Sequence, residues 1–200
     1  MEKEITDSNQ NANRKAITFV AKLLVLYVLF SQGNIFMNGV FSEGGNVYNA
    51  FLANHFDYVQ GLKSALIIPA VWLIKISGFY AIHNQSDVMV VDGPYIQVAY
   101  DCLGLGVMSF LAAFVIAFPA KLKPKLKLLV FGFVLIYLLN VLRITGLAVL
   151  MTIFSSQRDN FTYHHEIFNI LVYVCLFIVI YYWIKKNTGP ISTSPTNRSH

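Results

Sequence analysis

The chain has 200 residues, of which 56% are hydrophobic and only 12% are charged, and its mean hydropathy is +0.57. Soluble domains carry about twice that charged fraction, so the composition excludes an ordinary soluble enzyme and a disordered chain. Two cysteines are too few for a disulfide framework. The net charge of +5 does not indicate nucleic-acid binding, because the lysines lie at the ends of apolar segments, where they set membrane orientation.

The first part of the chain predicts a polar start and two apolar segments. Residues 1–13 are polar, carry both signs of charge and are predicted to be disordered on the cytoplasmic side. A basic pair then precedes an apolar segment, Ala16–Ser31, that predicts an uncleaved membrane helix. A second apolar segment, Leu62–Ile82, contains two lysines and a proline and is the weakest candidate span.

Residues 83–101 show a different pattern. Two short runs of β-branched and aromatic residues flank the turn sequence Asp92, Gly93 and Pro94. This arrangement predicts a short β-hairpin before the next helix.

The second half of the chain predicts three apolar helices, Leu103–Pro119, Leu126–Phe154 and Ile167–Ile184. The tail 187–200 is rich in Ser, Thr and Pro and is predicted to be disordered. The expected fold is therefore all-α: a polytopic transmembrane bundle of four to six helices, formed by one membrane domain over 14–186, with an extracytoplasmic β-hairpin.

Basic residues predict how this bundle is oriented. Four lysines in 121–127 and the pair Lys185 and Lys186 are expected to face the cytoplasm. Consequently the segments 83–102 and 155–166 are expected on the other side, which is the periplasm or the cell exterior.

The N-terminal half creates a parity problem for this orientation. The basic pair before the first span favours a cytoplasmic start, yet two complete spans from there would return residue 83 to the cytoplasm. Three solutions remain open. The segment Leu62–Ile82 is re-entrant or interfacial, or residues 32–61 contain another crossing, or the N-terminus lies outside.

Three polar residues are expected at one depth near the outer boundary. Counted from the nearest cytoplasmic lysine at about 1.5 Å per helical residue, Cys102 lies at roughly 28 Å, Arg143 at roughly 24 Å and His165 at roughly 30 Å. The hydrocarbon core is about 30 Å thick. Apolar patterning alone does not require this coincidence.

Arg143 lies in an otherwise apolar helix, where a central guanidinium costs about 2.5–3.5 kcal/mol on insertion scales. It is expected to face the protein interior or a water-filled cleft and to have an anionic partner; the alternative is an arginine that reaches the outer headgroups. Asn140 lies on the same helix face. It either orients Arg143 and joins the site or holds two helices together.

Cys102 is expected to begin a helix, whose N-terminus favours the nucleophilic thiolate, although a core cysteine is the alternative. Asp101 opposes a thiolate and is expected to cap the helix or to point away. Gly104 and Gly106 permit the close approach of a neighbouring helix or an extended peptide. Cys175 is expected in the middle of the bilayer, as a packing residue too distant for a disulfide with Cys102.

The pair His164 and His165, followed by Glu166, could begin a zinc site. Adjacent histidines diverge around a helix, however, and no further cluster of ligands is evident in the sequence. No metal is therefore predicted.

A cysteine, an arginine and a histidine at one depth form a set for thiol acyl transfer. Residues 88–184 resemble the exosortase/archaeosortase family of multi-pass membrane transpeptidases. The family motif of Cys, a small residue and Gly corresponds to residues 102–104, and its Asn-x-x-Arg motif to residues 140–143. The family's last helix begins with a histidine, which corresponds here to HEIFNILVY from residue 165.

The sequence departs from the family pattern at two positions. Leu103 stands where a small residue is usual, and Asn169 stands where glycine is common. The chain is also short, similar to compact members from Bacteroidota. The register of the last helix is the reason why His165 rather than His164 corresponds to the family histidine.

The resemblance implies a membrane-embedded thiol protease and transpeptidase of the inner (plasma) membrane, with its active site toward the periplasm or exterior. Its expected substrates are exported proteins with a C-terminal sorting signal, made of a short motif, a transmembrane helix and a basic tail. Lipids are the other expected partners, without nucleic acid or a cofactor. The resemblance implies three catalytic residues, Cys102, Arg143 and His165. It implies three supporting residues, Asn140, Gly104 and His164.

One alternative function belongs to a different class. The chain could be a non-enzymatic membrane assembly factor or a transporter subunit in which Arg143 binds an anionic lipid or solute.

Overall fold

The computed structural model describes residues 2–44, 47–91, 93–154 and 164–187, without the side chains of 2–9, 12 and 164–167. The described elements follow the chain in this order: α1 (Glu2–Phe41), α2 (Ala50–Phe56), α3 (Tyr58–Ile76), β1 (Ala81–His83), β2 (Asp87–Val90), β3 (Tyr95–Gln97), the 3₁₀-helix η1 (Tyr100–Leu103), α4 (Leu105–Ala117), α5 (Leu122–Ile153) and α6 (His164–Asn187).

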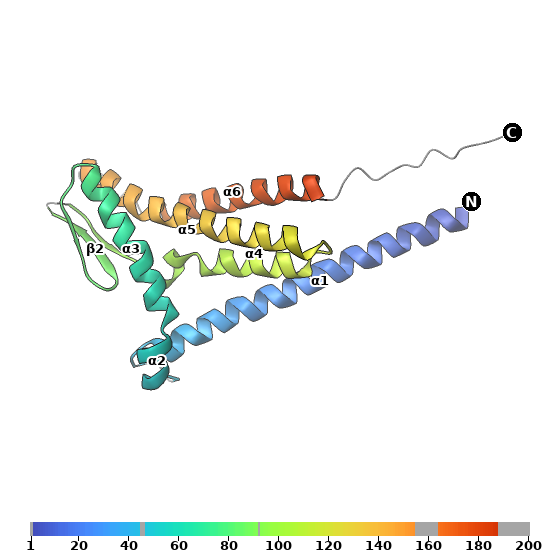
Figure 1. Cartoon of the computed structure of the whole chain (residues 1–200), viewed down its shortest axis with the longest axis horizontal. Coiled ribbons are helices and arrows are strands. Elements are labelled where there is room, and N and C mark those ends of the chain that lie inside the picture. The colour runs from blue at the N-terminus through green and yellow to red at the C-terminus, as the bar shows by residue number, and fades with distance from the viewer. Residues whose placement is uncertain (1, 45–46, 92, 155–163, 188–200) are drawn as a thin grey trace.

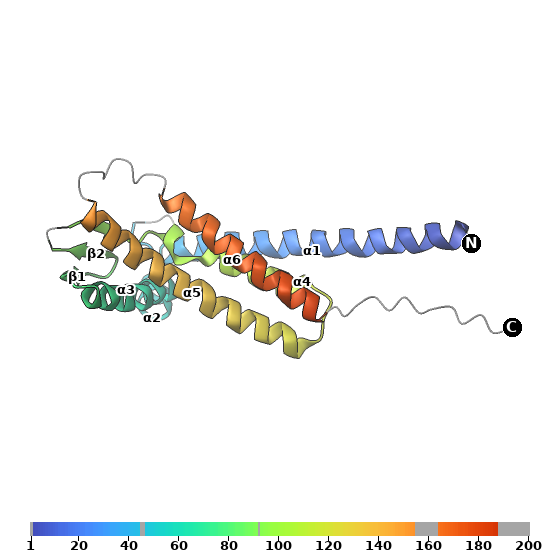
Figure 2. The ribbon, with the colours of Figure 1, turned by 90° about the horizontal axis from the view of Figure 1, so that it is seen from above.

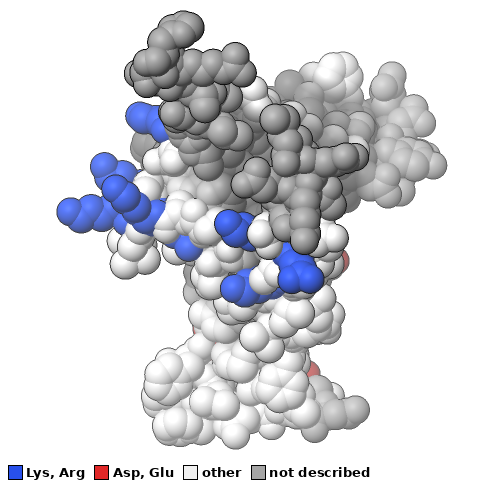
Figure 3. Space-filling view, turned by 90° about the vertical axis from the view of Figure 1, so that its right-hand side faces the viewer, with Lys and Arg blue, Asp and Glu red and all other residues white. Residues whose placement is uncertain are grey.

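Helices α1, α4, α5 and α6 run along the long axis of the molecule, whereas α3 lies across them (Figures 1 and 2). The start of α1, the end of α6 and the connection between α4 and α5 lie at one end of this bundle. We call this the basic end, because Lys and Arg side chains gather on it in Figure 3. The sheet and α3 lie at the opposite end, which we call the sheet end.

Four described helical segments are long and apolar enough to cross a membrane: Asn13–Phe41, Ala50–Ile76, Leu122–Ile153 and Phe168–Asn187. Helix α4 has only 13 residues and is about 20 Å long, shorter than the hydrocarbon core. The expected polytopic helical bundle with a small β-structure is therefore confirmed.

The orientation of α3 bears on the parity problem. One stripe of α3, formed by Leu66, Ala70 and Ile74, is buried in the protein, and the Tyr137 hydroxyl of α5 donates a hydrogen bond of 2.8 Å to the carbonyl of Ala65. The opposite stripe exposes the apolar side chains Ile68, Trp72 and Ile76. A helix that lies across the sheet end does not carry the chain back to the basic end. The structure thus favours the re-entrant or interfacial solution, with both termini of the bundle on the same side.

The predicted hairpin is present as β2 and β3, which pair antiparallel with Val88 opposite Ile96. Strand β1 adds to the other side of β2, so the sheet has the order β1-β2-β3. The sequence did not reveal β1, because Ala81 and Ile82 end an apolar segment that was assigned to a helix and His83 only follows it. That helix ends at Ile76 instead.

Helix α1 begins at Glu2, so the described residues before Asn13 are helical rather than disordered. No Gly or Pro occurs before Gly33, and a helix propagates readily through such a stretch once the apolar segment has formed it. The predicted disordered tail lies outside the described residues, apart from Asn187, the last residue of α6.

Two apolar clusters fill the interior. One, at the sheet end, joins α3, the sheet, η1 and the second half of α5, and begins on α5 at Val141. The other, toward the basic end, joins α4, α6 and the first half of α5, and ends on α5 at Ile136. The buried side chains of Asn140 and Arg143 lie where these clusters meet. This position defines a polar layer across the bundle.

A topology test separates the two possible paths of α3. A reporter that is active only outside the cytoplasm, fused after Gly44 or after Gly78, is expected to be active at both positions, because α3 lies across the bundle rather than along it. The same reporter fused within the lysine-rich segment 121–127 is expected to be inactive. Opposite results for the Gly44 and Gly78 fusions would show that α3 spans the membrane.

Candidate functional site

The polar layer is built around Arg143, which is only 3% exposed. Its Nη1 donates a hydrogen bond of 2.8 Å to Oδ1 of Asn169 on α6. Sixteen residues separate Lys127 from Arg143 on α5, and sixteen separate Asn169 from Lys185 on α6, so both side chains lie roughly 24 Å from the basic end. Arg143 therefore lies in the protein interior, as expected, rather than at the lipid headgroups.

Asn140 lies one helical turn before Arg143 and is only 2% exposed. Its Nδ2 is buried and has no hydrogen-bond partner among the described residues. This donor faces Gly104, where an added Cβ would collide with Nδ2 and lie 3.0 Å from Cγ2 of Ile136. The predicted close approach at Gly104 is thus observed, whereas a Cβ at Gly106 would meet nothing within 4 Å.

Cys102 lies in η1, and its N–H donates a hydrogen bond of 3.0 Å to the carbonyl of Ala99. The prediction that Cys102 begins the apolar helix is wrong, because α4 starts at Leu105. Gly104 has a φ of +73° and so adopts the left-handed conformation, which interrupts the helical path between η1 and α4. Both Cys102 and Cys175 are free thiols, as expected.

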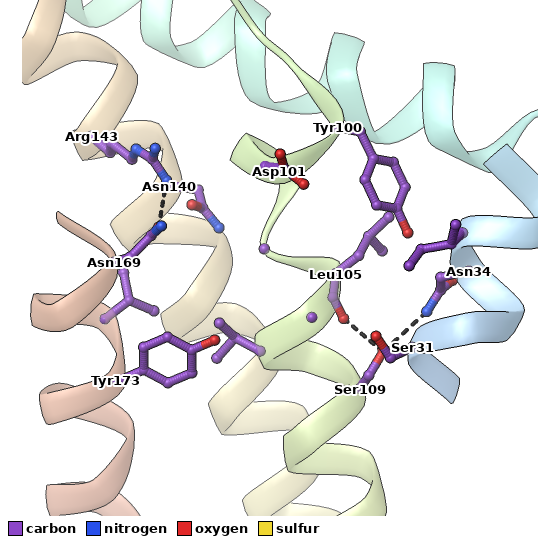
Figure 4. A pocket seen from close by; sticks show the side chains of 15 residues that line it. Ser31, Asn34, Tyr100, Asp101, Leu105, Ser109, Asn140, Arg143, Asn169 and Tyr173 are labelled. Carbon is purple, nitrogen blue, oxygen red and sulfur yellow. Dashed lines mark hydrogen bonds between the residues drawn. The ribbon is translucent and has the colours of Figure 1, made fainter. Parts of the chain in front are cut away.

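Two cavities adjoin the polar layer. The first, with a volume of about 480 Å³, contains Cys102 and extends between β3 and the Arg143 face of α5. The second, with a volume of about 290 Å³, lies between α1, α4 and α6 and contains Asn140 and Gly104 (Figure 4). We call them the cysteine cavity and the asparagine cavity. Three residues line both of them: Asp101, Arg143 and Asn169.

Asp101 does not cap α4. The residue at the N-cap is Gly104, which offers no side chain, and Asp101 is exposed. Because Asp101 lines both cavities, a carboxylate lies in the same cleft as the Arg143 guanidinium (Figure 4). The other expectation, that this carboxylate points away from the Cys102 thiol, stays a prediction.

A wall of the asparagine cavity comes from α1 and was not predicted. The Tyr58 hydroxyl donates to Oδ1 of Asn34 at 2.7 Å, and Nδ2 of Asn34 donates to Oγ of Ser109 at 3.1 Å. The Ser109 hydroxyl in turn donates to the carbonyl of Leu105 at 2.7 Å. The signal in the sequence was a set of hydrogen-bonding side chains on apolar helices, which need partners in a membrane interior.

Tyr100 lines the same cavity from η1. Burial raises the pKa of its hydroxyl, and Tyr58 and Asp101 nearby raise it further. The hydroxyl therefore stays protonated at neutral pH and can donate a hydrogen bond into the cavity.

His164 and His165 begin α6, but their side chains lie outside the described residues. The helical register places position 165 one turn before Asn169, on the stripe that continues through the buried side chains of Val172, Leu176 and Ile180. Within the described part of the chain, no three His, Cys, Asp or Glu side chains are grouped so that they could hold a metal ion.

The structure thus brings Cys102 and Arg143 into the lining of one cavity, and Asn140 and Gly104 into the lining of the next. Asn169 joins both cavities as the hydrogen-bond partner of Arg143. The sequence did not identify this role, because Asn169 was noted only as a departure from glycine.

Comparison with known proteins gives one family. A family model described as transmembrane exosortase matches residues 47–182, which is more than half of the 200-residue chain. The match includes Asn140, Arg143 and Asn169, and it begins after α1 has ended. Neither a curated protein nor a solved structure matches the chain.

Gly104 at the N-cap of α4 and Gly106 within the helix provide a matched pair of positions for a test of stability. Gly104→Ala is expected to lower the free energy of unfolding by about 1–3 kcal/mol, because the new Cβ meets Nδ2 of Asn140 in a left-handed backbone conformation. Gly106→Ala is expected to be neutral or to stabilise by up to about 1 kcal/mol, since it lies in open space within a helix. Unfolding curves of both variants in detergent test this, and equal destabilisation would contradict it.

Proposed function

Because the chain belongs to the transmembrane exosortase family, we propose that it is a membrane-embedded thiol protease and transpeptidase. It cleaves exported proteins near a C-terminal sorting signal and transfers the new acyl group to an acceptor. The observation that carries this proposal is the cysteine cavity, in which a thiol and a buried guanidinium line one space of about 480 Å³ at the level of the polar layer.

The charge distribution supports an active site on the outer side of the inner membrane. The basic end carries the lysine-rich connection and the end of α6, which the positive-inside rule assigns to the cytoplasm. The four acidic side chains that the structure describes all belong to segments at the sheet end: Glu43, Asp57, Asp87 and Asp101. A substrate's own transmembrane helix can lie beside the bundle and present its scissile bond at this end.

In the first step, His165 accepts the proton of Cys102, and the Sγ thiolate attacks the carbonyl carbon of the scissile peptide bond. The carbonyl oxygen becomes an oxyanion, which the Arg143 guanidinium stabilises through charge-assisted hydrogen bonds. The carbon–nitrogen bond then breaks, His165 returns its proton to the leaving amine, and a thioester remains on Cys102.

In the second step, an amine or hydroxyl of the acceptor attacks the thioester carbonyl and gives its proton to His165. The carbon–sulfur bond breaks and Cys102 leaves as a thiolate, which then regains its proton from His165. Water in place of the acceptor gives hydrolysis by the same sequence. No metal or organic cofactor takes part.

The surrounding residues support these roles. The hydrogen bond that Arg143 donates to Asn169 fixes the guanidinium plane, and one turn away Asn140 keeps an amide donor that has no partner among the described residues. Gly104 leaves space next to Nδ2 of Asn140, and a side chain at position 104 would fill that space. Position 165 lies on the same helical stripe as Asn169, whereas position 164 lies about 100° away around the helix and has a supporting part.

The alternative is a non-enzymatic assembly factor or transporter subunit that holds an anionic ligand through Arg143. Family membership favours the enzyme. A binding function alone also gives no reason for a thiol in the lining that Arg143 shares.

Substitution of the two cysteines tests the proposed nucleophile. Cys102→Ala is expected to abolish the processing of an exported protein that carries a C-terminal apolar helix and basic tail, because no thioester can form. Cys175→Ala is expected to retain processing, since that residue lies on α6 away from both cavities. The measurement is the mass shift of the substrate in the membrane fraction. Normal processing by Cys102→Ala would end the enzyme hypothesis.

The adjacent histidines provide a second test. His165→Ala is expected to lower the rate by roughly 10²–10⁴-fold, the usual contribution of a positioned acid–base group, and His164→Ala by much less. Single-turnover cleavage at matched expression levels measures both. An active His165→Ala variant beside an inactive His164→Ala variant would place the acid–base group at the other position, and two active variants would remove it from both.

A further inference from the structure

The cysteine cavity runs along β3, which is the last strand of the sheet. Successive residues of a strand point to opposite faces, so a cavity on one face would touch alternate residues only. This cavity is lined by three consecutive residues, Tyr95, Ile96 and Gln97, and by Ala99 beyond them. It therefore follows the edge of the strand rather than one face of the sheet.

The hydrogen-bond register identifies which backbone groups occupy that edge. The N–H of Val90 donates to the carbonyl of Pro94 at 3.1 Å, and the N–H of Val98 donates to the carbonyl of Ser86 at 2.9 Å. Bonded positions alternate in an antiparallel pair, so Ile96 also faces β2. The backbone groups of Tyr95 and Gln97 then point away from β2.

Most of these outward groups are available. The carbonyl of Gln97 accepts a hydrogen bond of 3.1 Å from the N–H of Ala99. Among the described residues, no group pairs with the N–H or carbonyl of Tyr95 or with the N–H of Gln97. These three groups are spaced so that a further strand, antiparallel or parallel to β3, can form hydrogen bonds with them.

From this edge we infer that β3 is a docking strand for the substrate: an extended peptide segment next to the scissile bond pairs with Tyr95 and Gln97 as a fourth strand of the sheet. This inference rests on the proposed function and assigns it a peptide-binding site. The site is continuous with the reactive thiol, because Cys102 lines the same cavity five residues after Gln97.

The opposite wall of the cavity sets a side-chain preference. Arg143, Leu147 and Met151 follow one another at intervals of four residues on α5 and all line it. Polarity thus falls along the wall, from the guanidinium to two apolar side chains. The peptide strand therefore presents an apolar side chain to Leu147 and Met151 while its scissile carbonyl approaches Cys102 and Arg143.

The test compares two thiol reagents on the full-length protein in lipid nanodiscs. One is acetyl-tetraalanine chloromethyl ketone, which has a peptide backbone, and the other is iodoacetamide, which does not. The quantity measured is the ratio of their rates of reaction with Cys102. Gln97→Pro, which removes an outward N–H from β3, is expected to lower this ratio by about tenfold, the value of one or two backbone hydrogen bonds.

A proline on the opposite edge of the sheet is the matched control. The N–H of Asn84 donates to the carbonyl of Asp87, and the N–H of Val91 donates to the carbonyl of Tyr80. Because bonded positions alternate along an antiparallel pair, the N–H of His83 on β1 points outward, away from β2. His83→Pro is expected to leave the ratio unchanged. An unchanged ratio in Gln97→Pro, or an equal fall in both variants, would overturn the inference.

A second measurement needs no variant. Hydrogen exchange of residues 95–97 is expected to slow by about tenfold or more in the peptide adduct relative to the iodoacetamide adduct, because pairing protects the amides. Equal exchange in both adducts would overturn the docking strand and leave the thiol mechanism standing. Failure of Cys102 to react with either reagent would contradict the thiol mechanism and the docking strand together.

Discussion

A guanidinium buried between two apolar clusters is the constraint on which the sheet end depends. Arg143 is 3% exposed in a chain whose surroundings are lipid, and an arginine in that position costs several kcal/mol unless it is hydrogen-bonded. Asn169 meets the guanidinium from α6 at equal depth, and the 13-residue α4 is short enough to leave η1, and with it Cys102, at the level of this layer. The residues that accommodate the charge therefore also bring a thiol into the lining of the same cavity.

The rest of the molecule surrounds this layer. Helix α3 lies across the sheet end and covers the outer half of α5, and the small sheet supplies one wall of the cysteine cavity. Helix α1, which precedes the segment matched by the family model, supplies the outer wall of the asparagine cavity through Asn34 and its partners Tyr58 and Ser109. A polar cleft in the interior of a membrane protein is thus lined by two parts of this chain, one within the family segment and one before it.

Much of this architecture could be predicted from the sequence, because lipid exposure makes apolar segments easy to recognise and lysines mark their ends. The hairpin was also predictable, from the turn sequence around Gly93. Four features were not. The path of α3 depends on packing against α5, which hydropathy does not report, and β1 is too short to have a pattern of its own. The break at Gly104 depends on a left-handed φ, and the same glycine in a continuing helix would look identical in the sequence. To recognise that Arg143 pairs with Asn169, one would have had to compare the depths of α5 and α6 residue by residue. The lysines that set those depths are present in the sequence.

The central chemical claim is that the Cys102 thiol, which shares a cavity with Arg143, carries the substrate as a thioester. Mass spectrometry of the tryptic peptide that contains Cys102 measures this directly, after co-expression with a tagged exported substrate and rapid acid quenching. The expected result is an acyl adduct on Cys102 that corresponds to the last tryptic peptide of the substrate's N-terminal fragment, less one water, and that hydroxylamine removes. Processing of the substrate without such an adduct at any time point, or with an adduct on Cys175 instead, would contradict it.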